Sequence, residues 1–146
     1  MSFNLQAFES ADFRERTRDV EIDADSPLAG FFGEGEPRVW TLRALTGKDL
    51  AVVNEAVDAA RNIEGLVSAL AGRVPDIGAI KQALGLDDKI KPPDYVRRLR
   101  LLKIGSVSPV ITDAHAVKIS KVAPVDFSRL TNAVLELTGQ GWKLGE

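Results

Sequence analysis

The chain has 146 residues, of which 45% are hydrophobic and 27% charged, and a formal net charge of −2; this composition is typical of a single folded domain and excludes wholesale disorder. It contains no cysteine, which excludes a disulfide framework, a thiolate nucleophile and the usual zinc sites. Its sequence pI near 5.5 argues against a dedicated nucleic-acid-binding domain, whose pI is usually above about 9.

The N-terminal third predicts a β-hairpin. The first residues lack both the basic start and the apolar core of a secretion signal, and polar and apolar side chains then begin to alternate. Trp40, Leu42 and Ala44 share one face of the better strand, as expected for residues that alternate across a pleated backbone. The predicted elements are an edge strand over 14–23, a turn rich in glycine and proline over 26–37, and a second strand over 38–45.

From Thr46 onward the apolar period becomes that of a helix. Thr46 is a good N-cap, and Asp49 three residues later completes a short-chained capping box. Two adjacent apolar stripes, the second of which starts at Val52, predict that this long helix packs on more than one neighbour. Gly65 marks a candidate break, and the pattern predicts a further short helix over 75–85.

Residues 91–106 form the most informative internal segment. Asp94 is expected to cap a helix after two prolines, with an ordinary core stripe on one side. The opposite side mixes large aliphatic side chains with guanidinium groups, a composition favoured at protein interfaces. The candidate protein-interaction residues are therefore Arg97, Arg100, Leu101 and Ile104. The alternative is that the arginine stems cover apolar surface of the chain itself.

Two more helices are predicted before the C-terminus. The first covers residues 112–122 and is capped by Thr112 or Asp113, and the second begins at Pro124 and ends with Gly139 as its C′ residue. The whole chain, residues 1–146, then reads as one predominantly α-helical α+β domain, in which a small N-terminal β-hairpin packs on about five or six helices. Its predicted parts are a hairpin region over 14–45, a helical body over 46–139 and a flexible tail over 140–146.

No catalytic, cofactor or metal site is predicted, and we expect a protein that is not an enzyme. His115 is the only histidine, and no nucleophile or orienting partner accompanies it at a recognisable spacing. The GKD sequence at 47–49 lacks the preceding glycine and the following Ser or Thr of a phosphate loop. A basic run extends from Lys89 to Lys103, but its four residues from 97 to 103 scatter around the helix axis and form no coherent phosphate-binding face.

Three segments carry a resemblance to a known family: WTLRALTGKD at 40–49, PPDYVRRLRLLKIGSVSP at 92–109 and FSRLTNAVLELTGQGWKLGE at 127–146. In this order they resemble the tail assembly chaperones of long-tailed bacteriophages and prophages. The likeness covers most of residues 38–146 and lies in the sequence of segments, not in a strict motif.

This resemblance implies a small helical protein of the bacterial cytoplasm that binds the tape measure protein, keeps its hydrophobic helices soluble and helps to recruit tail tube subunits. It implies neither a nucleic-acid partner nor a membrane partner, and it leaves self-association into a homo-oligomer open. The rival from another class is a structural virion component, such as a head–tail completion or tail terminator protein. A more distant rival is a nucleic-acid-binding regulator.

The C-terminal tail is a candidate junction for a longer product. The resemblance implies that a second form can arise by a translational frameshift near the end of the gene, and a flexible segment tolerates such an extension without disturbing a core. The alternative is an ordinary frayed terminus. The residues that mark the candidate junction are Gly139, Gly141, Trp142 and Gly145.

Overall fold

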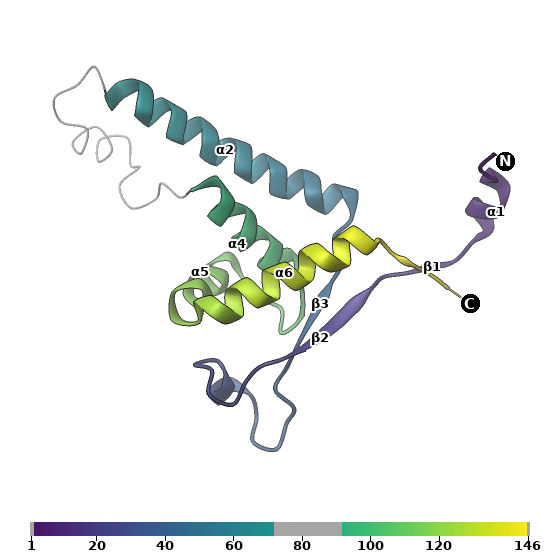
Figure 1. The fold of residues 1–146 in the computed structure, drawn as a ribbon, viewed down its shortest axis with the longest axis horizontal. Coiled ribbons are helices and arrows are strands. Elements are labelled where there is room, and N and C mark those ends of the chain that lie inside the picture. Colours follow the sequence, from purple (N-terminus) through teal and green to yellow (C-terminus); the bar gives the residue numbers. More distant parts are fainter. Residues whose placement is uncertain (1, 72–91, 146) are drawn as a thin grey trace.

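The computed structural model describes residues 2–71 and 92–145 and has the predicted α+β, mainly helical fold (Figure 1). The predicted helix over 75–85 lies outside the described residues. The elements are α1 (Leu5–Ser10), β1 (Phe13–Arg14), β2 (Thr17–Glu21), a 3-10 turn (Ala29–Phe31), β3 (Val39–Arg43), α2 (Gly47–Ala71), α4 (Pro93–Gly105), β4 (Ser106–Ser108), α5 (Asp113–Val122), α6 (Pro124–Gln140) and β5 (Lys143–Leu144).

The predicted hairpin is confirmed and gains a third strand. β2 pairs antiparallel with β3, so that Thr17 lies opposite Arg43. β4 pairs with the other edge of β3, with Leu42 opposite Ser106. Strand β3 is therefore central, and its face with Trp40 and Leu42 is buried, as its alternation predicts.

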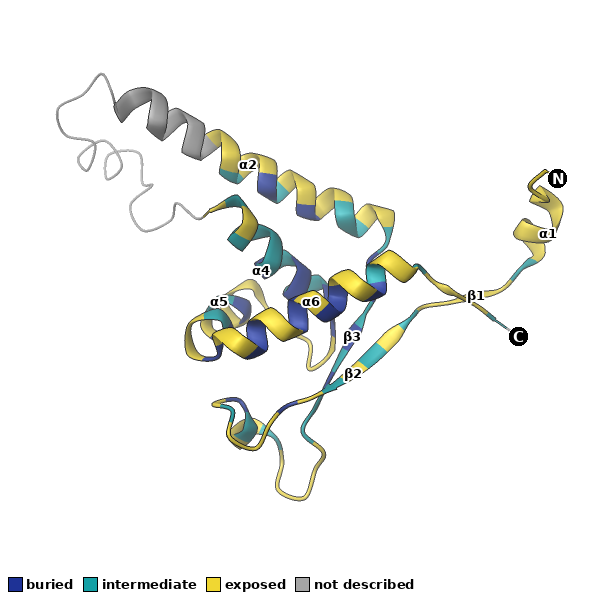
Figure 2. Cartoon of the chain, in the orientation of Figure 1, coloured by how far each residue is buried: buried dark blue, intermediate teal, exposed yellow. Residues whose placement is uncertain are grey.

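The core lies between the sheet and three helices. α6 packs on β2, β3, α4 and α5, and dark blue, buried positions follow α4 and α6 in Figure 2. Gly105 at the end of α4 is required for this approach, because a Cβ there would lie 2.7 Å from Cγ2 of Val134. Val134 itself is fully buried. These two helices therefore meet at a distance that only glycine permits.

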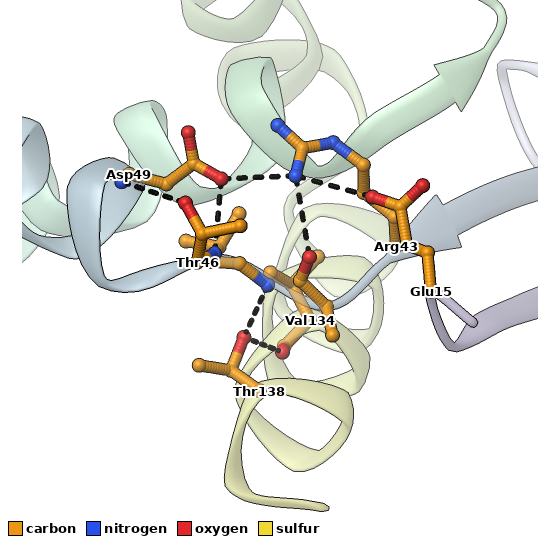
Figure 3. A network of polar contacts seen from close by, with 8 residues as sticks. Glu15, Arg43, Thr46, Asp49, Val134 and Thr138 are labelled. Carbon is orange, nitrogen blue, oxygen red and sulfur yellow. Dashed lines mark hydrogen bonds and ion pairs between the residues drawn. The ribbon is translucent and has the colours of Figure 1, made fainter. Parts of the chain in front are cut away.

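Helix α2 begins with the capping box that the sequence predicts (Figure 3). The Asp49 amide donates to Thr46 Oγ1 at 3.2 Å, and the Thr46 amide donates to Asp49 Oδ2 at 3.0 Å. The helix continues through Gly65 without a break. Within the described residues α2 packs mainly on α4, and Val52 on its second stripe is 45% exposed. The prediction that a second neighbour covers this stripe is therefore wrong at Val52, and the predicted helix over 75–85 lies outside the described residues.

Two predicted helix ends are corrected by the backbone. Pro92, not Asp94, is the N-cap of α4, and Asp94 lies in the exposed first turn. Gly139 lies inside α6, which ends at Gln140 and is followed by Gly141 with φ of 71°. A positive φ suits a residue without a Cβ, so the second of the two neighbouring glycines stops the helix.

The sequence predicts a flexible tail over 140–146, but part of this tail pairs with the N-terminal region of the chain. Its β5 pairs antiparallel with β1, and the Gly145 amide donates to the Asp12 carbonyl oxygen at 2.7 Å. This two-stranded ribbon carries α1 away from the helical body (Figure 1). We refer to residues 2–14 as the N-terminal arm.

Candidate binding site: an apolar groove

An apolar groove of about 690 Å³ lies where the β2–β3 loop faces α5. Its volume falls in the range of sites that take drug-sized ligands or several apolar side chains. Four segments supply its lining, namely the loop (Leu28, Phe31, Phe32, Gly33, Glu36, Pro37), β3 (Val39, Trp40, Thr41), the end of β4 with the stretch that follows it (Ser108, Pro109, Ile111) and α5 (His115, Lys118, Ile119, Val122).

The floor of the groove is held from the core side. Trp40 is 5% exposed, and its indole N–H donates to Ser106 Oγ at 3.0 Å. Ser106 Oγ in turn donates to the Leu102 carbonyl oxygen. Because the polar atom of the indole is satisfied inside the protein, only its apolar ring remains for the groove.

The loop wall is fixed to the start of α6. Ser26 Oγ donates to the buried carboxylate of Asp126 and accepts a hydrogen bond of 3.1 Å from the Leu28 amide. Leu28 is buried as an anchor, whereas Phe31, three residues later in the 3-10 turn, is 89% exposed. The loop therefore holds a large aromatic side chain in solvent on a tethered backbone.

The opposite wall is one face of α5, whose lining residues follow helical spacing. Thr112 is the N-cap, and the amide of Thr112 donates to Nδ1 of His115 at 3.1 Å, while the His115 amide donates to Thr112 Oγ1 at 3.3 Å. This local cap explains His115 without catalysis. Further along the wall Ile119 is buried and Val122 is 45% exposed.

The predicted interaction residues on α4 do not form an open surface. Leu101 has no exposed area and Ile104 packs against the core, so the prediction that they face a partner is wrong for Leu101. Arg100 is held by Asp113, with Nη1 at 3.0 and 3.1 Å from its two carboxylate oxygens. Arg97 lies 3.9 Å from Asp94 within the same helix. Both guanidinium groups are thus paired with carboxylates of the chain itself.

The candidate junction residues are distributed over the end of α6 and the ribbon. Gly139 is exposed in the helix, Gly141 follows it, and Gly145 bonds to the arm. Trp142 is 45% exposed. None of the four lines the groove.

A network of charged and polar groups lies at the start of α2, away from the groove (Figure 3). Arg43 Nη1 donates to Asp49 Oδ2 at 2.9 Å and lies 3.4 Å from Glu15 Oε1. Partial burial would raise the pKa of Asp49, but hydrogen bonds from Thr46 and Arg43 outweigh it and lower that pKa. Oδ2 of the ionised Asp49 carboxylate caps α2 and pairs with Arg43, so we assign this network to stabilisation of the fold.

The network also ties α6 to the same corner. The Leu45 amide donates to Thr138 Oγ1 at 3.0 Å, and Thr138 Oγ1 donates to the Val134 carbonyl oxygen at 2.7 Å. The junction between β3 and α2 is thus closed by satisfied polar groups.

Within residues 2–71 and 92–145 no helix is long and apolar enough to cross a membrane. Over the same ranges, no three His, Cys, Asp or Glu side chains gather to form a candidate metal site. No protein-family model, curated protein or solved structure matches the chain. The groove and the resemblance of the sequence are therefore the two supports for a function.

Sequence reasoning identified the loop over 26–37 only as a turn. The signal that could have marked it is the pair Phe31 and Phe32 in a glycine-rich loop. Successive side chains of an extended chain point to opposite sides, so two adjacent phenylalanines cannot both be buried on the same face of a sheet. The groove is lined by four segments, and the sequence of any one of them does not predict it.

Proposed function

We propose that the protein is a phage tail assembly chaperone that binds apolar helical segments of the tape measure protein, its client, in the groove between the β2–β3 loop and α5. The observation that supports this proposal is an open groove of about 690 Å³ with an exposed phenylalanine at its rim. Exposed apolar surface in a concave site is typical of protein recognition.

The chemistry of the groove suits an amphipathic helix. The α5 wall presents residues at i, i+3, i+4 and i+7, from His115 to Val122. A second helix can lay its apolar stripe between such a wall and Phe31, as in other helix-in-groove recognition. Glu36 and Lys118 at the lining offer charges of both signs to the polar edges of that client helix.

The activity is non-catalytic in this proposal. Binding holds the apolar face of each client helix out of water, so that client helices do not associate with one another. Delivery of tail tube subunits to the covered client is the further role that the resemblance implies.

Co-expression with a helical segment of the tape measure protein tests the proposal. The wild-type chain should keep the segment in the soluble fraction and co-purify with it, and Phe31→Asp should lose both effects because it places a charge at the apolar rim. Val125→Asp is the matched control, since Val125 is 70% exposed on α6 and does not line the groove. Equal solubilisation by both variants would reject the groove as the client site.

The rival functions have different signatures. Presence of the chain in purified virions would identify a structural component, and retardation of DNA that weakens steeply with salt would identify a nucleic-acid-binding regulator. A chaperone is absent from the virion and shows no such retardation.

A further inference from the structure

The N-terminal arm presents an apolar surface that the other described residues leave exposed. Phe3, Leu5 and Phe8 are 72%, 67% and 48% exposed. The phenylalanine rings lie against one another, with centroids 5.4 Å apart for Phe3 and Phe8 and 5.7 Å apart for Phe8 and Phe13. The three rings therefore form one contiguous exposed apolar surface, which is typical of a protein-interaction site.

The arm and the groove lie at opposite ends of the β2–β3 hairpin (Figure 1). The arm joins the hairpin at the start of β2, with only residues 15 and 16 between β1 and β2. Its base is held by the pairing of β1 with β5. Docking of the arm in the groove of its own chain would break that pairing, whereas docking in a second copy leaves it intact.

The outer part of the arm and the α5 wall of the groove carry opposite charges. Residues 2–12 contain Glu9 and Asp12 but no lysine or arginine, and the basic residue of the arm, Arg14, lies at its base in β1. Leu5, Phe8 and Glu9 lie at i, i+3 and i+4 on α1 and so share one side of it. Lys118 lines the groove and, among the described residues, has no carboxylate within ion-pair distance. An arm that inserts Phe8 beside α5 brings a carboxylate toward this ammonium group.

We propose that, when no client is bound, the N-terminal arm of one copy occupies the groove of a second copy. The contact joins two different surfaces, so it can be reciprocal within a dimer or continue from copy to copy. The arm then shields Phe31 and the groove until a client helix displaces it. The exchange is inferred from the arm and the groove alone, whereas displacement by a client rests on the proposed function.

Complementation between two defective chains tests the exchange by sedimentation velocity. The wild-type chain should associate as its concentration rises, while an arm variant (Phe3→Ser with Phe8→Ser) and a groove variant (Phe31→Asp) should each remain monomeric. All three changed side chains are exposed, so both variants should keep the wild-type circular dichroism spectrum. An equimolar mixture should form a heterodimer, because it contains one intact arm and one intact groove.

Three results would overturn the exchange: a monomeric wild-type chain, self-association of either variant at the wild-type concentration, or a mixture that stays monomeric. Val125→Asp should associate as the wild type does. A labelled peptide of residues 2–12 should bind the arm variant, detected by fluorescence anisotropy, and Phe31→Asp should abolish the signal. Displacement of this peptide by a tape measure segment tests the shared site, and its failure with intact complementation would reject the proposed function while leaving the exchange standing.

Discussion

Helix α4 and the β2–β3 loop use similar side chains in opposite ways. Both combine large apolar residues with charged ones, yet Leu101 on α4 has no exposed area and Phe31 on the loop is 89% exposed. α4 has α2, α5 and α6 around it, whereas the loop is tethered at Ser26 and Leu28 and open on its other side. The number of elements that surround a segment therefore decides whether its apolar residues stabilise the fold or remain available for binding.

The charged residues of the two regions follow the same difference. On α4, Arg100 is engaged by Asp113, and Lys103 Nζ lies 3.4 Å from the same carboxylate. At the groove, Glu36 and Lys118 make no ion pair with another described residue. The groove keeps both apolar and charged groups free for a partner, which α4 does not.

The largest effect is expected for Leu101→Asp. The substitution buries a carboxylate without a partner among the helices and removes a fully buried aliphatic side chain. We expect a loss of about 4 kcal/mol or more, enough to remove cooperative unfolding from a domain of this size. Thermal denaturation followed by circular dichroism measures it. A stably folded Leu101→Asp variant would show that the two regions differ less than their burial suggests.

A smaller effect is expected for Gly105→Ala at the end of α4. The new Cβ would lie 2.7 and 3.0 Å from the two γ-carbons of Val134, which is β-branched and buried, so the helices must separate slightly. We expect a loss of about 1–3 kcal/mol in urea unfolding. Gly139→Ala is the matched control, because nothing lies within 4 Å of its Cβ position, and it should stabilise α6 by about 0.5–1 kcal/mol. Equal behaviour of the two alanine variants would contradict the close approach of α4 and α6.

A still smaller effect is expected for Arg100→Gln, which removes the contact of Nη1 with both carboxylate oxygens of Asp113 while keeping much of the side-chain stem. Both partners are partly exposed, so the loss should be no more than about 1 kcal/mol and should shrink further as salt is added. Arg97 Nη1 lies 3.9 Å from Asp94 Oδ1, a longer contact within the described residues, so Arg97→Gln should change stability less. A loss that does not depend on salt would indicate that the guanidinium stem, and not its charge, stabilises α4.

The elements with strong local signals could be predicted from the sequence. Alternation predicts the hairpin and the buried face with Trp40 and Leu42, and capping side chains predict the start of α2 at Thr46 and that of α5 at Thr112 or Asp113, of which Thr112 is the N-cap. Each of these signals depends on residues within a few positions of one another.

Features that depend on distant partners were not predicted. β4 and β5 are three and two residues long, and their strand character comes from pairing with β3 and β1. Leu101 lies on the predicted outer face of α4, but three neighbouring helices leave that helix no outer face at this position. The groove escaped prediction for the same reason, because its loop and its α5 wall are about 80 residues apart in the sequence.

The smallest effect on stability, and the largest on binding, is expected for Phe31→Asp. Phe31 is 89% exposed, so replacing its ring removes little packing and should change the free energy of unfolding by no more than about 0.5 kcal/mol. The same change places a carboxylate at the apolar rim, where a docked helix would have to desolvate it, so co-purification of a tape measure segment should be lost. Val125→Asp should leave both measurements near the wild-type values, since Val125 is also exposed but lies outside the groove. A marked fall in the melting temperature of Phe31→Asp alone would make Phe31 a structural residue of the loop. The apolar side chains of the loop would then stabilise the fold as those of α4 do, and the result would contradict the groove as a binding surface.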